Sequence, residues 1–182
     1  MSALLIILLQ VIVCFDKYTK VASIFMKIAL LQTGKTTDKH VNEGVDIYSA
    51  RIRKYSGFEI ITLPDLKNTR NMSVTEQKIK EGKKIMQSIG KDDFVVFLDE
   101  RGKELRTVEF AALLEKRFLM TGKRILFVIG GPWGMSEEVI NIADFRLSLS
   151  KMTFPHQLVR LLFLEQLYRA LTIIKGEPYH HE

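Results

Sequence analysis

The sequence predicts an α/β protein built on a parallel sheet, because short apolar runs alternate with longer amphipathic ones. The apolar runs consist mainly of Ile, Leu, Val and Phe, as in strands that are buried on both faces. Five runs are predicted as strands: Lys27 to Leu31, Phe58 to Leu63, Phe94 to Leu98, Arg124 to Ile129 and Arg146 to Leu149. We therefore expect one domain over residues 26–182.

Helices are predicted between these strands, where they would cross over the sheet. In the run Val41 to Tyr55, apolar residues recur at spacings of three and four, and Gly57 ends the run. Two further helices are expected over Thr75 to Ile89 and Val108 to Met120, each followed by a glycine. The last, about Gln157 to Ile174, is apolar almost all round, which predicts burial on more than one side and hence a homodimer.

Composition limits the classes of function. The 182 residues carry a formal charge of +6, from 27 Lys and Arg against 21 Asp and Glu, which favours an anionic partner such as nucleic acid. A single cysteine, Cys14, excludes an internal disulfide, and the four histidines lack the spacing of a zinc site. We expect a cytoplasmic protein without a metal.

Residues 1–25 differ from the rest of the chain, because Ala3 to Phe15 is almost uninterruptedly apolar. The run is shorter than the roughly 20 residues of a membrane helix, and no Lys or Arg precedes it as in a secretory signal. A strand pattern begins at Met26, so we expect translation to start there and no membrane association. A membrane anchor and an additional packed helix are the alternatives.

A glycine-rich loop follows the fourth predicted strand, with glycines at 130, 131 and 134. Glycine has no Cβ, so the backbone can approach a flat ring or a phosphate closely. Glu137 and Glu138 come next and disfavour an anion at that helix end. The loop matches neither a dinucleotide-binding motif nor a P-loop. A tight turn without a ligand explains the glycines equally well.

Three charged residues stand on the last predicted helix. Arg160 lies near the glycine loop and is expected to reach an RNA phosphate. Glu165 and Arg169 are four residues apart and can equally pair with each other. The tail from Gly176 to Glu182 offers an aromatic ring and two imidazoles, although terminal residues often fray.

Taken together, four segments resemble the RlmH-type ribosomal RNA methyltransferases of the SPOUT superfamily. They are Ile129-Gly130-Gly131-Pro132-x-Gly134, Leu149-Ser150-Lys151-Met152-Thr153-Phe154-Pro155-His156-x-Leu158-Val159-Arg160, Leu164-Glu165-Gln166-Leu167-Tyr168-Arg169-Ala170, and Pro178-Tyr179-His180. The order and spacing of all four make the resemblance specific. It covers about residues 26–182, and the first 25 residues have no counterpart in it.

The resemblance implies a single-domain parallel SPOUT sheet whose C-terminal part is threaded as a trefoil knot, an exception to the usual absence of knots. It also implies S-adenosylmethionine as the cofactor and a homodimer in which the partner completes each active site. The implied cofactor contacts are Leu98, Gly130, Leu149, Ser150, Lys151, Met152, Thr153 and Phe154.

In the implied reaction, the sulfonium methyl group moves in line to N3 of a pseudouridine in the large-subunit (23S) RNA of the ribosome. Because that nitrogen is mostly protonated at neutral pH, we expect a base, either His180 or His156. Tyr179 is expected to stack on the base of the nucleotide, and Arg160 and Arg169 to hold phosphates.

Three other functions are weighed against this one. A non-catalytic RNA-binding scaffold would not need the intact glycine loop. A SPOUT enzyme acting on transfer RNA is disfavoured because the chain is short and has no added RNA-binding domain. A Rossmann-type oxidoreductase would need a glycine motif after the first strand, where only Gly34 stands.

Overall fold

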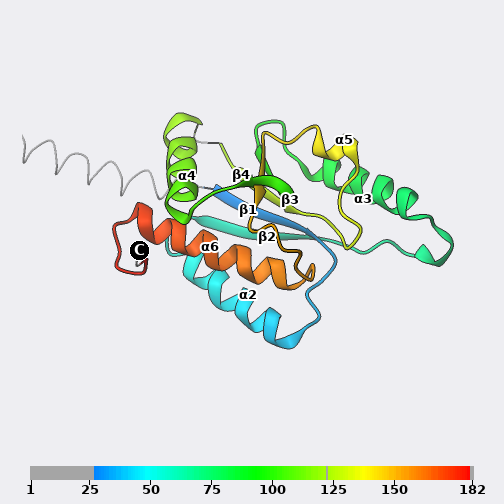
Figure 1. The fold of residues 1–182 in the computed structure, drawn as a ribbon, viewed down its shortest axis with the longest axis horizontal. Helices are drawn as coiled ribbons and strands as arrows, with labels where there is room; N and C mark the ends of the chain where they lie inside the picture. The colour runs from blue at the N-terminus through cyan, green and yellow to red at the C-terminus, as the bar shows by residue number, and fades with distance from the viewer. Residues whose placement is uncertain (1–26, 122, 181–182) are drawn as a thin grey trace, which may run out of the picture.

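The computed structural model describes residues 27–121 and 123–180 (Figure 1). The expectations for residues 1–25, including the start at Met26, lie outside the described residues. The strands are β1 (Lys27–Thr33), β2 (Gly57–Leu63), β3 (Phe94–Glu104), β4 (Ile125–Ile129) and β5 (Phe145–Ser148). They form one parallel sheet in the order β2-β1-β4-β3-β5, which confirms the predicted sheet.

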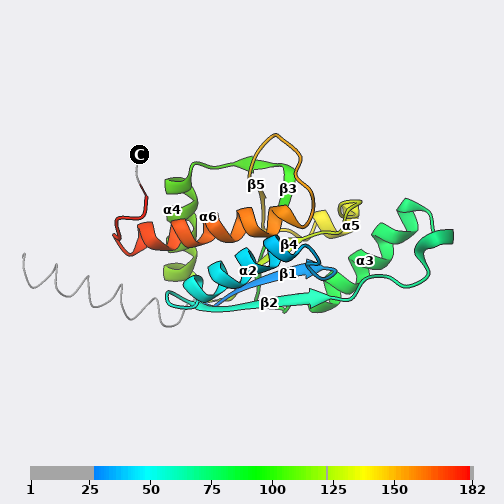
Figure 2. The same ribbon diagram turned by 90° about the horizontal axis from the view of Figure 1, so that it is seen from below.

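Helices cover both faces of the sheet (Figures 1 and 2). On one face α6 packs between α2 and α4, and on the other face lie α3 and α5. Their bounds are α2 Lys39–Ile52, α3 Val74–Ser88, α4 Thr107–Thr121, α5 Glu137–Ile140 and α6 Leu158–Ile174, with a 3-10 turn, η1, at Thr69–Asn71. The four helices predicted from the spacing of apolar residues are confirmed to within a few residues at their ends.

The core is divided by the sheet because successive side chains of a strand point to opposite faces. On β1, Ile28 and Leu30 join the cluster under α2, α4 and α6, whereas Ala29 and Leu31 join the cluster under α3. All five residues of β4 are buried. Burial on both faces explains why these strands are continuously apolar in the sequence.

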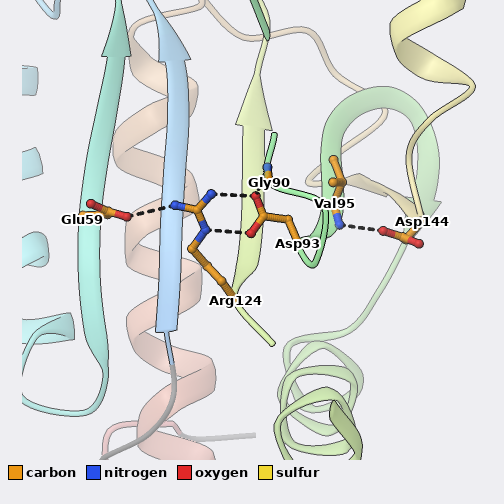
Figure 3. Close-up of polar contacts among 6 residues, drawn as sticks. All are labelled: Glu59, Gly90, Asp93, Val95, Arg124 and Asp144. Atoms are coloured by element: carbon orange, nitrogen blue, oxygen red, sulfur yellow. Dashed lines mark hydrogen bonds and ion pairs between the residues drawn. The ribbon is translucent and has the colours of Figure 1, made fainter. Parts of the chain in front are cut away.

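The amino ends of the strands are joined by a network of ionic hydrogen bonds (Figure 3). Arg124, just before β4, donates to Asp93 through Nε (2.8 Å) and Nη2 (2.6 Å), and to Glu59 of β2 through Nη1 (3.1 Å). The Gly90 amide also donates to Asp93, at 2.7 Å. Burial alone would raise the pKa of Asp93, but these donors outweigh it and hold that pKa below its usual range.

At the other end of the sheet, β3 continues beyond Leu98, where its apolar run ends. Leu147 of β5 pairs with both Leu98 and Lys103 of β3, so the register of this strand pair shifts at residues 99–102. A Cβ on Gly102 would lie 2.8 Å from backbone atoms of Arg146 and Leu147. The close crossing of two backbones therefore requires glycine at position 102.

Candidate functional site

A cleft of about 600 Å³ opens beyond the carboxyl ends of β3, β4 and β5. Its walls come mainly from residues 98–101, 129–135 and 146–156. Ligands of open parallel sheets bind outside the carboxyl ends of the strands, and this volume suits a small organic molecule. The cleft is therefore the candidate site.

The cleft brings most of the predicted cofactor contacts together. Those that line it are Leu98, Gly130, Leu149, Ser150, Met152, Thr153 and Phe154. Lys151 does not line it, because its side chain is exposed and its Nζ lies 3.9 Å from Glu104. Any contact of Lys151 with a ligand in the cleft would have to use its backbone.

The glycine loop forms the wall that follows β4. Gly134 has a φ of +77°, in the left-handed region that favours glycine, and its amide donates to the carbonyl of Gly131 at 3.0 Å. A Cβ on Gly131 would lie 2.5 Å from Oε2 of Glu81. The loop is thus a tight turn that also borders the cleft, so the two interpretations of its glycines are compatible.

Glu81 of α3 packs against the glycine loop at Gly131. The sequence did not predict a role for this residue. Its side chain is only 9% exposed, and Oε2 has no hydrogen-bond partner within residues 27–121 and 123–180. Burial raises the pKa of Glu81, the nearby carboxylate of Asp65 raises it further, and Lys84 opposes both. A glutamate on an amphipathic helix gives no sign in the sequence that it will be buried.

The segment after β5 is shaped by its own hydrogen bonds. The Ser148 hydroxyl donates to the carbonyl of Ser150, and the Ser150 hydroxyl accepts from the amide of Met152, both at 2.9 Å. Arg146 is paired with Asp99 of the neighbouring strand β3, and its Nε donates to that carboxylate at 3.0 Å. These bonds fix the wall formed by residues 146–152.

The two candidate bases lie at opposite ends of α6. His156 lines the cleft just before the helix begins, whereas His180 follows its last turn and does not line the cleft. A helix of 17 residues is about 25 Å long, so one chain cannot bring both imidazoles to the same cleft. Figure 1 shows α6 running toward the C-terminus of the chain.

The expectation that Arg160 reaches an RNA phosphate is wrong. Its side chain is 0% exposed, Nη2 donates to the carbonyl of Thr33 at 2.6 Å, and Nη1 donates to Oγ1 of Thr36 at 2.8 Å. Burial lowers the pKa of this guanidinium. Arg160 therefore ties the start of α6 to the loop after β1.

Arg169 and Tyr179 lie together at the far end of α6. Arg169 pairs with Glu165, at 2.5 Å from Nη2 and 3.0 Å from Nε, which confirms the predicted pair. Its guanidinium carbon also lies 4.9 Å from the centre of the Tyr179 ring, which meets Tyr168 edge-on. Beside them, Nδ1 of His180 is buried and has no partner among the residues that the structure describes.

The tail is anchored to the body of the protein as far as residue 180. The Tyr55 hydroxyl donates to Glu177 at 2.5 Å, and the Glu177 amide donates to the carbonyl of Thr172 at 3.0 Å. Burial, together with the Glu177 carboxylate, raises the pKa of Tyr55 above its ordinary value. The tail therefore holds a defined position instead of fraying.

Among the described residues, no group of three or more His, Cys, Asp or Glu side chains is arranged to hold a metal ion. None of the helices described in residues 27–121 and 123–180 has the length and apolar character needed to cross a membrane.

Comparison with known proteins finds a matching family and close relatives. Residues 26–180 match the family described as predicted SPOUT methyltransferase. The chain is 45% identical to the ribosomal RNA large subunit methyltransferase H of Bacteroides thetaiotaomicron and 51% identical to that of Christiangramia forsetii. These alignments cover 86% of this chain and 100% and 99% of the two relatives. A probable methyltransferase from Bordetella pertussis superposes with a TM-score of 0.49 and 14% identity, over 85% of this chain and 99% of that one.

Proposed function

Because the chain belongs to the SPOUT methyltransferases, and within them to the ribosomal RNA large subunit methyltransferase H family, we propose that it methylates N3 of a pseudouridine in 23S ribosomal RNA. The methyl donor is S-adenosylmethionine, and the substrate is the ribosome in the cytoplasm. The observation that carries the proposal is the cleft, where the glycine loop and residues 149–154 converge although they are separate in the sequence.

The cleft residues fit this cofactor. Leu98, Ile129 and Leu149 give apolar walls for a flat adenine, and the backbone beside Gly130 is open to close approach. When bound, S-adenosylmethionine supplies a methyl group on a positively charged sulfur, which a nucleophilic nitrogen can attack. The task of the protein is then to align the two reactants and to remove the N3 proton.

We also propose that the C-terminal part of the chain is threaded as a trefoil knot. The support is the register shift at residues 99–102 of β3, where Leu147 of β5 pairs with both Leu98 and Lys103, and the close approach of Gly102 to the backbone of β5. A loop that encloses a strand lets the segments on either side of that strand form one rigid cleft. The knot would thus fix the cofactor contacts relative to one another.

The proposed enzyme is a homodimer in which the tail of one copy completes the cleft of the other. The support is the length of α6, about 25 Å for 17 residues, which separates the tail from the cleft of its own chain. In the dimer, His180, Tyr179 and Arg169 of one copy meet the RNA at the cleft of the partner. The buried Nδ1 of His180 suits a residue held in one orientation.

Mixed dimers test this arrangement. Gly131→Ala damages the cleft, and His180→Ala damages the tail. The assay uses a cofactor concentration too low for Gly131→Ala to be saturated, so that each variant alone has little activity. If the tail acts on the partner, random mixing of the two variants restores about a quarter of the wild-type activity, because half of the dimers then contain one intact site of two. No restoration after mixing would place both functions in one chain and contradict the shared site.

The identity of the base is tested by two single substitutions. If His180 takes the N3 proton, His180→Ala lowers the rate of methyl transfer by about 10²- to 10⁴-fold and removes its pH dependence, whereas His156→Ala has a smaller effect. The reverse order of effects would assign the base to His156. An unchanged rate and pH profile in the His180 variant would rule out the tail base.

The methylation reaction is tested with purified protein, labelled S-adenosylmethionine and ribosomes that lack the modification. Mass spectrometry of the digested RNA locates any new methyl group. We expect it on N3 of a large-subunit pseudouridine. Transfer to a different nucleotide would overturn the proposed specificity, and absence of transfer to any ribosomal RNA would overturn the proposed substrate.

A further inference from the structure

Trp133 stands out at the mouth of the cleft. It lies in the glycine loop, its side chain is 50% exposed, and it is the only tryptophan of the chain. Tryptophan has the largest apolar side chain, and its exposure leaves a broad aromatic face in contact with water. The mechanism proposed above does not use this face.

The surroundings of Trp133 combine apolar and cationic groups. Met152, which is 74% exposed, and Phe154 stand on the segment after β5 and line the same cleft. Arg101, in the register-shifted part of β3, and Lys78, on α3, also line it. Two carboxylates line the cleft as well, those of Asp99, which pairs with Arg146, and of Glu100. An aromatic face next to cations is the combination that binds single-stranded nucleic acid, because bases stack on the ring and phosphates meet the charges.

We propose that Trp133 is a stacking platform for a base of the substrate RNA, and that Arg101 and Lys78 bind the phosphates next to that base. This inference rests on the proposed function, since it names contacts of the same RNA at the same cleft. It also assigns the cationic contact that Arg160, being buried, cannot make.

The position of Trp133 favours RNA over two other occupants. The inner walls of the cleft already offer apolar cover through Ile129, Leu147 and Leu149, so the cofactor does not need the exposed indole. In the proposed dimer the partner's tail also reaches this cleft, but a chain of net charge +6 does not complement Arg101 and Lys78, which leaves these two cations for the RNA. An anionic polymer with flat bases complements both features of the rim.

The first experiment measures ribosome binding and methylation by Trp133→Ala and Trp133→Phe. Stacking of one base contributes about 1–3 kcal/mol, so the alanine variant should bind ribosomes about 5- to 150-fold more weakly and show a KM raised to match. Phenylalanine keeps an aromatic face and should restore most of the affinity. In both variants the affinity for S-adenosylhomocysteine, measured by calorimetry, should stay at the wild-type value.

Ile47→Ala is the matched control, because Ile47 is 52% exposed, lies on α2 and does not line the cleft. It should leave both affinities unchanged. Wild-type ribosome affinity in Trp133→Ala would overturn the proposal. A loss of cofactor affinity in that variant would overturn it as well and assign Trp133 to the cofactor, and a change from dimer to monomer would assign it to the subunit interface.

The cationic rim is tested by salt dependence. Each phosphate contact that is lost reduces the slope of log affinity against log salt concentration by about one. We expect this reduction for Arg101→Gln and for Lys78→Gln, with cofactor affinity unchanged. Unchanged slopes would remove both residues from the RNA contact.

The fluorescence of the single tryptophan separates this inference from the proposed function. Titration of the wild-type protein with a short RNA stem-loop that carries a pseudouridine should quench Trp133, and S-adenosylhomocysteine alone should not. If ribosomes are methylated but neither quenching nor the KM effect of Trp133→Ala is seen, the stacking proposal fails and the proposed function stands. If no methyl group is transferred yet RNA quenches Trp133, the proposed function fails and the stacking site stands.

Discussion

The two ends of the parallel sheet differ in how completely their buried charged groups are hydrogen-bonded. At the amino ends, Asp93 accepts three hydrogen bonds, and Arg124 also reaches Glu59 (Figure 3). At the carboxyl ends, Oε2 of Glu81 and Nε of Arg160 are buried and have no partner among the described residues. Oxygens of Gln32 and Thr33, at the end of β1, are in the same situation.

This difference suggests that the amino ends of the strands contribute mainly to stability and the carboxyl ends mainly to ligand binding. A buried ion pair with satisfied hydrogen bonds fixes the strands to one another, and breaking it is costly. Buried polar groups without partners cost free energy instead, and proteins tolerate them mainly where a ligand or ordered water is bound. The cleft lies at the carboxyl ends and the hydrogen-bond network of Arg124 at the amino ends, so we expect substitutions at the amino ends to change stability and those at the carboxyl ends to change cofactor affinity.

The largest effect is expected from Arg124→Ala, which leaves the carboxylate of Asp93 buried and unpaired. The free energy of unfolding should fall by about 3–5 kcal/mol, or roughly 10 °C in Tm. The affinity for S-adenosylhomocysteine, measured by calorimetry below the transition, should not change. Reduced affinity in the folded variant would contradict the separation of the two ends.

Lys123→Ala is the control for this change, because the pair between Lys123 and Asp92 is exposed and should contribute no more than about 1 kcal/mol. The Arg124 effect also has a pH dependence. The lowered pKa of Asp93 means that its contribution is complete above the ordinary pKa of aspartate and is lost as pH falls through the lowered value. Thermal unfolding of both variants across the acid range measures this loss.

Gly131→Ala should have the second largest effect, and its effect should be on binding. The added Cβ lies 2.5 Å from Oε2 of Glu81, so either the glycine loop or the buried glutamate must move. We expect cofactor affinity to fall about 10- to 100-fold, because displacements near 1 Å cost that much, and stability to fall by only about 1 kcal/mol.

Glu81→Ala in the same chain should restore much of this affinity, because the Cβ then has room. Gly44→Ala is the control: its Cβ would lie 2.8 Å from Leu161, between α2 and α6, so it crowds two residues that do not line the cleft. It should cost similar stability without affecting cofactor affinity. Failure of the double variant to recover would show that Glu81 does not support the loop.

The smallest effect is expected from Glu81→Gln. It should change only the way in which the free energy of unfolding depends on pH. Because the pKa of Glu81 is raised, the folded state binds its proton more tightly than the unfolded state does. Wild-type stability therefore falls as pH rises from the ordinary pKa of glutamate through the raised value, and the glutamine variant should lack this fall. Parallel stability curves for the two proteins would show that Glu81 ionises without penalty.

The strands and helices could be predicted because burial on two faces or on one leaves a periodic pattern of apolar residues. The end of β3 could not be predicted, because the stretch from Asp99 to Glu104 is polar and is held in place by pairing with β5. The burial of Arg160 was missed for a similar reason. Its hydrogen-bond partners, Thr33 and Thr36, are more than 120 residues away in the sequence.

The residues of the cleft, too, could be predicted only in part from the sequence. The resemblance to a family drew attention to Gly130 and to residues 149–154, and the structure places most of them along the walls of one cleft. Trp133, Arg101 and Lys78 belong to three different segments, and only the fold brings them to one rim. No local pattern in the sequence marks such a group.

The most direct test is a crystal structure of the protein with S-adenosylhomocysteine. We expect density for one ligand per chain at the carboxyl ends of β3, β4 and β5, with its adenine between the backbone of Gly130 and residues 149–154. Density anywhere else, or a saturated crystal with this cleft empty, would contradict the proposed cofactor site.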